Sequence, residues 1–315
     1  MATVFIDGAA GTTGLEIANR LAARDDIALI TLDEGQRKDA RARRDALNAA
    51  DFAILCLPDD AAREAVAMID PHARTRIIDA SSAHRVAQGW TYGFPELVGK
   101  DRIAQARRVS NPGCYPTGFL ALVVPLIRAG LLPADWPYTV HAVSGFSGGG
   151  KALISRFERD PGIAFRTYGL DLMHKHLAEM QAVAGLCHAP VFSPAVVPAM
   201  RGMIVEVPLP RNVMSRAAPA DEMRACLREY YCYSRLVAGP PAVAPAELQL
   251  RNDVPGWDGI ELFVASDAND TQARLLARLD NLGKGASGAA VQSLNLMAGC
   301  DEYAGLRTDN PYATA

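Results

Sequence analysis

The chain has no hydrophobic segment long enough to cross a membrane. None of its apolar runs approaches the ~20 residues that a transmembrane helix requires. The N-terminal residues enter a strand pattern at once, and no secretory leader precedes that pattern. We therefore expect a protein that is neither inserted into a membrane nor exported.

An excess of charge of one sign is also absent. The 32 Lys and Arg residues nearly balance the 35 Asp and Glu residues, and the formal net charge is -3. Such a chain offers no bulk attraction for nucleic acid or for an anionic membrane surface, so we expect neither as a partner. An anionic ligand must then be held by local groups.

Cysteine is scarce, with six in 315 residues and no spacing that suggests a disulfide framework. This usage is typical of reduced thiols, and we expect the protein to be cytoplasmic. Most such cysteines are inert core residues, and this is our interpretation of Cys56, Cys187, Cys226, Cys232 and Cys300.

The hydrophobic pattern that is present predicts an α/β fold. A length of 315 residues favours two domains, or one domain with a large insertion. Through the first third, short apolar runs alternate with helical patterns, which indicates a doubly wound parallel sheet covered by helices. The predicted strands are Val4–Ile6, Ala28–Leu32, Phe52–Leu57, Arg76–Ala80 and a run ending near Val109, and the predicted helices cover Leu15–Ala22 and Asp60–Ile69.

A second domain with an α+β pattern follows a boundary near Asn111. Strands are predicted over Val140–Val143 and Met203–Val207, with Pro and Gly between the elements. A last helix covers roughly Gly288–Met297, and the Ala/Pro-rich stretch Pro240–Ala246 is a predicted surface loop.

A glycine turn directly follows the first strand. Gly8, Gly11 and Gly14 occur as G-A-A-G-T-T-G and open the first helix, where backbone N–H groups and the helix dipole can meet a phosphate. The spacing differs from G-x-G-x-x-G, so a tight turn without a ligand is the alternative. We expect a dinucleotide site.

The end of the second strand carries charges of both signs. Asp33 and Glu34 stand where an NAD enzyme places a carboxylate on the ribose, whereas Arg37 and Lys38 could hold a 2′-phosphate. A solvated charged turn would explain the same four side chains. The residues alone leave the choice between NADP and NAD open.

Cys114 is the exception among the cysteines. It lies in S-N-P-G-C-Y-P-T-G, where Pro and Gly predict an exposed turn just ahead of an apolar helix that begins near Thr117. The N-terminal end of a helix favours the thiolate, which is the nucleophilic form. We therefore expect Cys114 to be reactive.

A nucleophile needs a group that handles protons, and the sequence M-H-K-H-L-A-E offers two histidines. His174 and His176 are candidates, with Glu179 available to orient one of them. If the segment is a strand, both rings share one face and could bind a metal, but a third ligand at suitable spacing is not evident. We expect no metal site.

Two further glycine clusters have the composition of ligand-binding loops. Ser144–Gly150 precedes Lys151, and the second cluster covers Asp280–Gly288; glycine lets the backbone approach a ligand closely, although both could be plain flexible loops. Arg85 and Arg201 are candidate anion clamps, because a guanidinium matches phosphate and carboxylate in a forked geometry. Either could instead be a surface ion-pair residue.

Taken in order, these blocks resemble one family. The glycine turn, D-A-S-S-A-H-R, Y-G-F-P-E-L, S-N-P-G-C-Y-P-T, S-G-F-S-G-G-G-K and D-N-L-G-K-G-A-S-G resemble the shorter form of the N-acetyl-gamma-glutamyl-phosphate reductases. The likeness spans nearly the whole chain. It implies a Rossmann-type dinucleotide-binding domain over residues 1–112 and 287–315. It also implies an α+β catalytic and dimerisation domain of glyceraldehyde-phosphate-dehydrogenase type over residues 113–286.

The resemblance also implies roles for individual residues. Cys114 would be the acylated nucleophile and His176 the acid/base, with His174 the close alternative, since Ala178 replaces a proline common in the family. The implied substrate contacts are Arg85 on the departing phosphate, Arg201 on a carboxylate, and Asn111, Ser144 and Gly145. The implied NADP(H) contacts are Gly8, Ala10, Gly11, Thr12, Thr13, Gly14, Arg37, Lys38, Ser82, Asn281 and Gly288.

The implied reaction is reduction of N-acetyl-L-glutamyl 5-phosphate to the 5-semialdehyde through a thioester, in a homo-oligomer, either dimer or tetramer. The nearest rival is an acyl-phosphate reductase for aspartyl or aminoadipyl phosphate. Two rivals of other classes are a non-catalytic NADP-binding redox sensor and a zinc hydrolase that uses the histidine pair.

Overall fold

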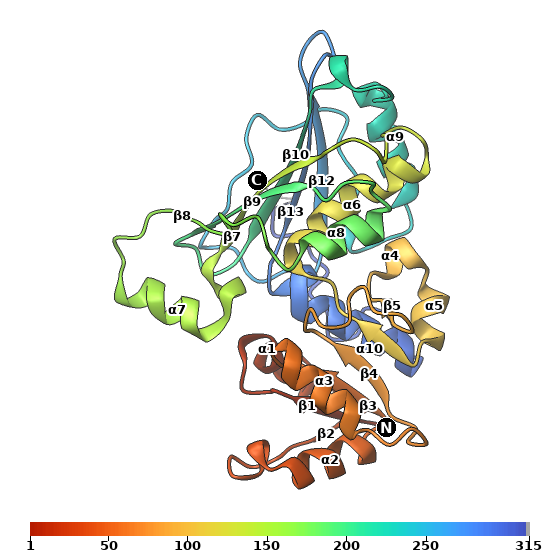
Figure 1. The fold of residues 1–315 in the computed structure, drawn as a ribbon, viewed down its shortest axis with the longest axis vertical. Helices are drawn as coiled ribbons and strands as arrows, with labels where there is room; N and C mark the ends of the chain where they lie inside the picture. The colour runs from red at the N-terminus through yellow and green to blue at the C-terminus, as the bar shows by residue number, and fades with distance from the viewer. Residues whose placement is uncertain (313–315) are drawn as a thin grey trace. The chain divides into compact units, whose positions relative to one another are not determined.

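The computed structural model describes residues 1–312, which fold into two compact units (Figure 1). Unit 1 comprises residues 1–113 and 286–306, and unit 2 comprises, among the described residues, 114–285 and 307–312. The sequence analysis assigned that last segment to the first domain. It belongs to unit 2 because Arg307 exchanges hydrogen bonds with Asp258, whose carboxylate accepts its N–H at 2.7 Å. The expectation for residues 313–315 lies outside the described residues.

Unit 1 is built on a parallel sheet of six strands in the order β2-β1-β3-β4-β6-β5. Every neighbouring pair in this sheet is parallel. The predicted doubly wound arrangement is therefore confirmed. The strands are β1 Ala2–Asp7, β2 Ile27–Ile30, β3 Phe52–Leu55, β4 Arg76–Asp79, β5 Thr91–Tyr92 and β6 Arg108–Ser110.

Helices cover both faces of this sheet, because successive strand residues point to opposite sides. Val4 and Ile6 pack in one cluster with α1, α5 and α10, whereas Phe5 packs in another with α2 and α3. The helices are α1 Thr12–Leu21, α2 Ala40–Ala49, α3 Asp59–Met68, α4 Pro95–Val98, α5 Lys100–Gln105 and α10 Gly288–Ala298, with a short 3-10 turn, η1, at Gln36–Lys38.

Unit 2 contains a mixed sheet of seven strands in the order β11-β12-β13-β10-β7-β9-β8. Its strands are β7 Thr139–Gly145, β8 Arg166–Thr167, β9 Val191–Val197, β10 Met203–Leu209, β11 Val237–Ala238, β12 Ile260–Ser266 and β13 Ala273–Leu279. Its helices are α6 Cys114–Arg128, α7 Gly150–Arg159, α8 Leu177–Ala184 and α9 Ala220–Tyr230, with 3-10 turns η2 Phe146–Gly149 and η3 Arg211–Val213. A π-helical turn, η4, spans Gly283–Ser287.

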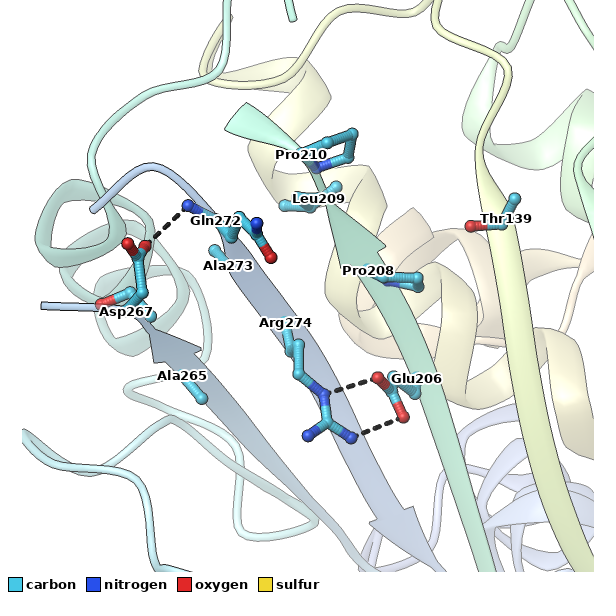
Figure 2. A pocket seen from close by; sticks show the side chains of 11 residues that line it. Thr139, Glu206, Pro208, Leu209, Pro210, Ala265, Asp267, Gln272, Ala273 and Arg274 are labelled. Carbon is cyan, nitrogen blue, oxygen red and sulfur yellow. Dashed lines mark hydrogen bonds and ion pairs between the residues drawn. The ribbon is translucent and has the colours of Figure 1, made fainter. Parts of the chain in front are cut away.

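Helix α6 covers one face of the unit 2 sheet, and α8 and α9 flank it (Figure 1). Every residue from Tyr115 to Leu126 is buried. Gly118 lets the helix approach β10, since a Cβ there would lie 2.7 Å from Val205 Cγ2. The opposite face carries a groove of about 610 Å³ (Figure 2). Beside it, Arg274 Nε and Nη2 donate to the two carboxylate oxygens of Glu206 at 2.6 and 2.8 Å.

Element types and most boundaries agree with the sequence-based expectations. The predicted strand Ala28–Leu32 stops at Ile30, because Asp33 begins a hydrogen-bonded turn. Pro240–Ala246 lies outside helices and strands, as expected of a loop. No helix within residues 1–312 is long and apolar enough to span a bilayer.

A half-buried arginine joins two helix ends in unit 1. Arg76, the first residue of β4, donates to the carbonyls of Ala104 and Ala106 at the end of α5 and to that of Met297 in the last turn of α10. Carbonyl groups at a helix C-terminus lack intrahelical partners and favour a cation. Burial lowers the pKa of Arg76, which nonetheless stays a cation.

We predict that Arg76→Met lowers the free energy of unfolding by about 2–4 kcal/mol, because it leaves these carbonyls without their charged donor. Urea denaturation followed by circular dichroism measures the change. Arg63→Met is the matched control: its ion pair with Asp60 is exposed, and we expect a change within ~0.5 kcal/mol. A loss below ~1 kcal/mol for Arg76→Met would contradict this account.

Candidate functional site

The glycine turn after β1 has a backbone that other residues cannot adopt. Gly8 has a φ of +91°, and a Cβ there would lie 2.3 Å from the carbonyl oxygen of Cys56, at the end of β3. At Gly14 a Cβ would lie 2.5 Å from the carbonyl oxygen of Gly8. The turn thus lies against the carboxyl ends of β1 and β3. The strand order reverses there, and open α/β sheets bind their ligands at such a point.

The start of α1 fits a dinucleotide phosphate. Its N-cap is Gly11, no side chain caps the helix, and its first turn has no acidic residue. The hydroxyl oxygen of Thr12 is buried and has no hydrogen-bond partner within residues 1–312. Ala10 is exposed and Thr13 is half-buried beside it. Unpaired N–H groups and an unpaired hydroxyl are the donors that a phosphate requires.

The turn after β2 exposes charged side chains of both signs. Asp33 accepts the N–H of Gln36 at 2.8 Å, and Gln36 Oε1 accepts the N–H of Asp33 at 3.4 Å, a reciprocal arrangement like a capping box. The Asp33 carboxylate therefore stabilises the turn itself. Arg37 and Lys38 are exposed on it. This geometry favours a phosphate over a ribose hydroxyl at this position.

Sequence analysis missed an ion pair next to the glycine turn. Asp7, the last residue of β1, is buried, and Arg43 of α2 donates to its carboxylate at 2.8 Å. The signal available was an acidic residue immediately before the first glycine, but its partner lies 36 positions away. The pair neutralises the carboxylate nearest to the candidate phosphate site.

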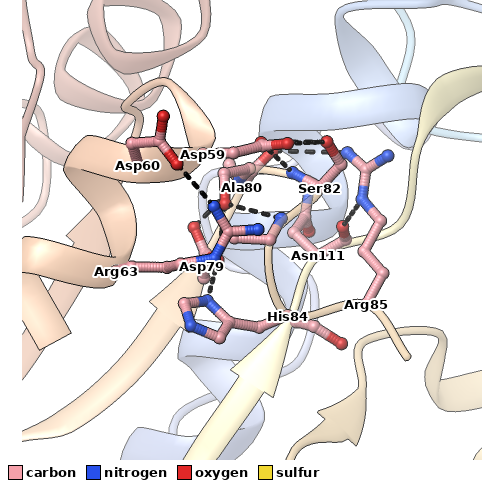
Figure 3. A network of polar contacts seen from close by, with 12 residues as sticks. Asp59, Asp60, Arg63, Asp79, Ala80, Ser82, His84, Arg85 and Asn111 are labelled. Carbon is pink, nitrogen blue, oxygen red and sulfur yellow. Dashed lines mark hydrogen bonds and ion pairs between the residues drawn. The ribbon is translucent and has the colours of Figure 1, made fainter. Parts of the chain in front are cut away.

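A polar network follows β4 (Figure 3). Oδ2 of the fully buried Asp79 accepts from the Ser81 hydroxyl at 2.7 Å, and His84 Nδ1 lies 2.6 Å from the same oxygen. His84 stacks on Trp90 with 4.2 Å between ring centroids. Ser82, a predicted cofactor contact, hydrogen-bonds to Asp59, with 2.7 Å between its hydroxyl and Oδ2.

The same network holds the segment that precedes Cys114. Arg85 Nε donates to the carbonyl of Asn111 at 3.1 Å, and the N–H of Asn111 donates to the carbonyl of Asp79 at 2.7 Å. Asn111 Nδ2 donates to the carbonyl of Ala286 at 3.0 Å. Its Oδ1 is buried without a partner in the described part of the chain, so it is available to a ligand.

Cys114 is the first residue of α6, so the helix begins three residues earlier than expected. Its side chain is half-buried. Gly285 lies against it, since a Cβ at position 285 would lie 2.9 Å from Cys114 Cβ. The second glycine of the D-N-L-G-K-G-A block, Gly285, therefore leaves room for the Cys114 side chain. A sulfur at the first position of a helix lies where the dipole stabilises an anion.

The two histidines and Tyr115 form an aromatic cluster in unit 2. The ring centroids of His174 and His176 are 4.6 Å apart, and those of Tyr115 and His176 are 5.8 Å apart. The histidine segment is not a strand: it is a turn in which His174 Nδ1 accepts the N–H of His176 at 3.2 Å. His176 precedes α8 directly, and Glu179 is buried in the first turn of that helix.

A pair of tyrosines, which sequence analysis did not single out, lines this cluster. Tyr168 donates to the Tyr115 hydroxyl at 3.3 Å, and Tyr115 donates to the carbonyl of Ala195 at 3.2 Å. Burial raises the pKa of Tyr115 well above its usual value and, with the Cys114 anion nearby, raises that of Tyr168 to about 12. Both hydroxyls therefore remain protonated donors. In the sequence, the only indication of this pair was the position of Tyr115 directly after Cys114.

Other predicted contacts in unit 2 already have protein partners. Arg201 pairs with the buried Asp280 at 3.0 Å. Asn281 accepts the N–H of Gly202 at 2.9 Å and donates to Ser147 at 2.9 Å, so its amide joins two loops. Gly145 lies close to the loop at Ala199, where a Cβ would meet the carbonyl oxygen at 2.7 Å. Ser144 is buried in β7, and Gly288 begins α10, in unit 1.

The remaining cysteines differ from one another. None of the six forms a disulfide, and all lie within the described residues. Burial raises the pKa of Cys56 to about 12, which agrees with an inert thiol. The core interpretation is wrong for Cys187 and Cys232, which are exposed because each lies in a surface turn. Residues 1–312 contain no group of three or more His, Cys, Asp or Glu placed to bind a metal.

Two protein-family models match the chain. The semialdehyde dehydrogenase NAD binding domain matches residues 3–106, and the semialdehyde dehydrogenase dimerisation domain matches residues 114–281. N-acetyl-gamma-glutamyl-phosphate reductase 2 of Nostoc sp. is 48% identical, over 96% of this chain and 98% of that protein. N-acetyl-gamma-glutamyl-phosphate reductase of Brucella ovis is 50% identical, over 94% of this chain and 98% of its own length.

Solved structures with the same fold share less sequence. Aspartate semialdehyde dehydrogenase from Francisella tularensis has a TM-score of 0.71 at 14% identity, covering 95% of this chain and 100% of that one. Aspartate semialdehyde dehydrogenase II from Vibrio cholerae has a TM-score of 0.69 at 16% identity, covering 95% and 98%. From the family models and the closely similar relatives, the chain belongs to the semialdehyde dehydrogenase family and, within it, to the N-acetyl-gamma-glutamyl-phosphate reductases.

Proposed function

We propose that this chain reduces N-acetyl-L-glutamyl 5-phosphate to N-acetyl-L-glutamate 5-semialdehyde and phosphate with NADPH, as a step of arginine biosynthesis. Relatives with 48–50% identity over nearly the whole chain bear the name of this reaction. The observation that carries the proposal is the half-buried Cys114 at the first position of α6, followed by Tyr115 in contact with two histidine rings.

In the first half-reaction, the Cys114 thiolate attacks the acyl carbon of the substrate. A carbon–sulfur bond forms, the bond from that carbon to the phosphate oxygen breaks, and phosphate leaves with the electron pair. Splitting one difficult reduction into two steps through a thioester makes each step easier. The helix N-terminus stabilises the thiolate before the attack and accounts for the position of the residue.

In the second half-reaction the thioester is reduced, and a proton must reach the developing alkoxide. NADPH, when bound, supplies the hydride. We assign the proton donor to His176, with His174 as the alternative and Glu179 as the group that orients the pair. General acid help of this kind contributes on the order of 10² to 10⁴ in rate. The thiohemiacetal then collapses, which releases the aldehyde and restores the thiol.

The cofactor contacts proposed from the sequence remain our assignment. The glycine turn and the start of α1 supply N–H donors and the Thr12 hydroxyl for the phosphates. Gly288 and Ser82 are assigned as further cofactor contacts. The exposed Arg37 and Lys38 supply the charge for a 2′-phosphate. Asn281 contributes by holding the loops at Ser147 and Gly202, as its two hydrogen bonds indicate.

The substrate contacts are likewise proposals. Arg85 is assigned to the departing phosphate, and Asn111 offers its buried Oδ1 to a donor. Ser144 and Gly145 belong to the strand end that precedes the glycine cluster. Arg201 was assigned to a substrate carboxylate, and in the structure its Nη1 pairs with Asp280.

We further propose that the protein acts as a homo-oligomer, a dimer or a tetramer, in the cytoplasm. The match of residues 114–281 to a dimerisation domain supports self-association. Six cysteines without disulfides agree with a reducing compartment.

The direct test is a steady-state assay of the reverse reaction. N-acetylglutamate 5-semialdehyde, phosphate and NADP should give NADPH, and omitting phosphate should abolish the reaction, because phosphate releases the acyl group. NAD should serve less well, since Arg37 and Lys38 then lack a 2′-phosphate partner. Faster turnover with an aspartate or aminoadipate semialdehyde would overturn the substrate assignment.

Cys114→Ser should bind NADPH with unchanged affinity and form no acyl-enzyme, because a hydroxyl lacks an accessible anion near neutral pH. Mass spectrometry of enzyme mixed with acyl phosphate measures the thioester, and nucleotide fluorescence measures binding. Cys232→Ser, at an exposed thiol, is the matched control and should behave as the unmodified protein. Full turnover by Cys114→Ser would remove the central assignment.

His176→Asn should slow both half-reactions on the order of 10²-fold or more while leaving NADPH affinity nearly intact. Single-turnover kinetics of acylation and of hydride transfer measure the two steps separately. His174→Asn is the comparison variant, and the two together assign the acid/base. If only His174→Asn slows the chemistry, His174 carries the role instead.

A further inference from the structure

Arg166 is a second arginine of unit 2 with a defined orientation. It lies in β8, the edge strand that pairs antiparallel with β9 through Arg166 and Val196. Tyr168 directly follows β8, two residues after Arg166. The guanidinium carbon lies 4.6 Å from the centroid of the Tyr168 ring. Stacking on an aromatic face is a favoured mode for a guanidinium and fixes its plane.

Tyr168 connects this guanidinium to the reactive cluster. Its hydroxyl donates to Tyr115, the residue after Cys114, at 3.3 Å, and its ring centroid lies 5.6 Å from that of His174. The charge of the Cys114 anion raises the pKa of Tyr168 while Arg166 lowers it, so both charges act on this side chain. One tyrosine therefore borders both the arginine and the candidate catalytic groups.

Arg166 differs from other arginines of unit 2 in what it contacts. Arg201 pairs with Asp280, and Arg278 pairs with Glu261 at 2.7 Å. Arg166 makes no ion pair with a carboxylate in the part of the chain that the structure describes, and its side chain rests on a ring. A half-buried guanidinium held this way is preorganised for an external planar anion.

We propose that Arg166 binds the free carboxylate of the substrate and makes the enzyme select acyl phosphates that carry one. The inference rests on the proposed function and names a residue that decides its specificity. In an N-acetylglutamyl group this carboxylate lies four carbon–carbon bonds from the acyl carbon, about 5 Å when extended. Arg166 rests on the ring of Tyr168, and the same ring lies 5.6 Å from that of His174, so the guanidinium borders the cluster in which the acyl carbon is proposed to react.

Two aldehydes that differ only in this carboxylate test the proposal. N-acetylglutamate 5-semialdehyde has the group, and 4-acetamidobutanal lacks it. With phosphate and NADP, Arg166→Met should lower kcat/KM for the first aldehyde about 100-fold and for the second less than about threefold. Arg166→Lys should fall between, because an ammonium keeps the charge without the planar fork. Arg251→Met, at an exposed arginine paired with Asp253, is the matched control.

A second measurement does not depend on turnover. N-acetyl-L-glutamate should protect Cys114 from alkylation by iodoacetamide in the unmodified protein, and this protection should require about tenfold more ligand in Arg166→Met. An equal loss of activity on both aldehydes, or unchanged selectivity and unchanged protection, would overturn the assignment of Arg166. Turnover of neither aldehyde by the unmodified protein would refute the proposed reaction, while the alkylation result would still decide the role of Arg166.

Discussion

The position of Cys114 depends on the packing of α6 against the unit 2 sheet. Residues Tyr115–Leu126 are all buried, and Gly118 brings the helix within contact of Val205. Burial on this scale fixes the helix axis, and the axis fixes its first residue. The thiol is therefore held by a hydrophobic interface although it stays half-buried itself. Rigid support of this kind lets a reactive group keep one orientation.

Neighbouring residues also restrict the orientation of the Cys114 side chain. Gly285 lies against the Cys114 side chain from one side, and Tyr115 begins the aromatic cluster with the histidines. The tyrosine hydroxyls donate along a short chain that ends at the carbonyl of Ala195. Because burial keeps both hydroxyls protonated, the chain places no competing anion beside Cys114.

Internal pairing of acidic groups explains how a chain of net charge -3 can serve anionic ligands. Asp7 is neutralised by Arg43, and Asp33 accepts backbone hydrogen bonds within its own turn. In unit 2, Asp280 is satisfied by Arg201. Pairing of the buried Asp7 and Asp280, and the use of Asp33 within its own turn, leave Arg37, Lys38 and Arg166 as local positive groups, and local fields rather than net charge decide where an anion binds.

The sequence by itself determined the fold class, the glycine turn and the position of Cys114 at the start of an apolar helix. These features are local: apolar periodicity sets strands and helices, and the residues that shape the turns at Gly8 and Cys114 are neighbours in the chain.

Only the tertiary structure decided the partners of the charged and aromatic side chains. Tyr168 and Tyr115 are 53 positions apart, and Arg201 and Asp280 are 79 positions apart. The histidine segment, considered as a possible strand for the metal alternative, is a turn closed by the hydrogen bond from the His176 N–H to His174 Nδ1. Pairings across such separations arise from how helices and strands pack, and no local pattern in the chain encodes them.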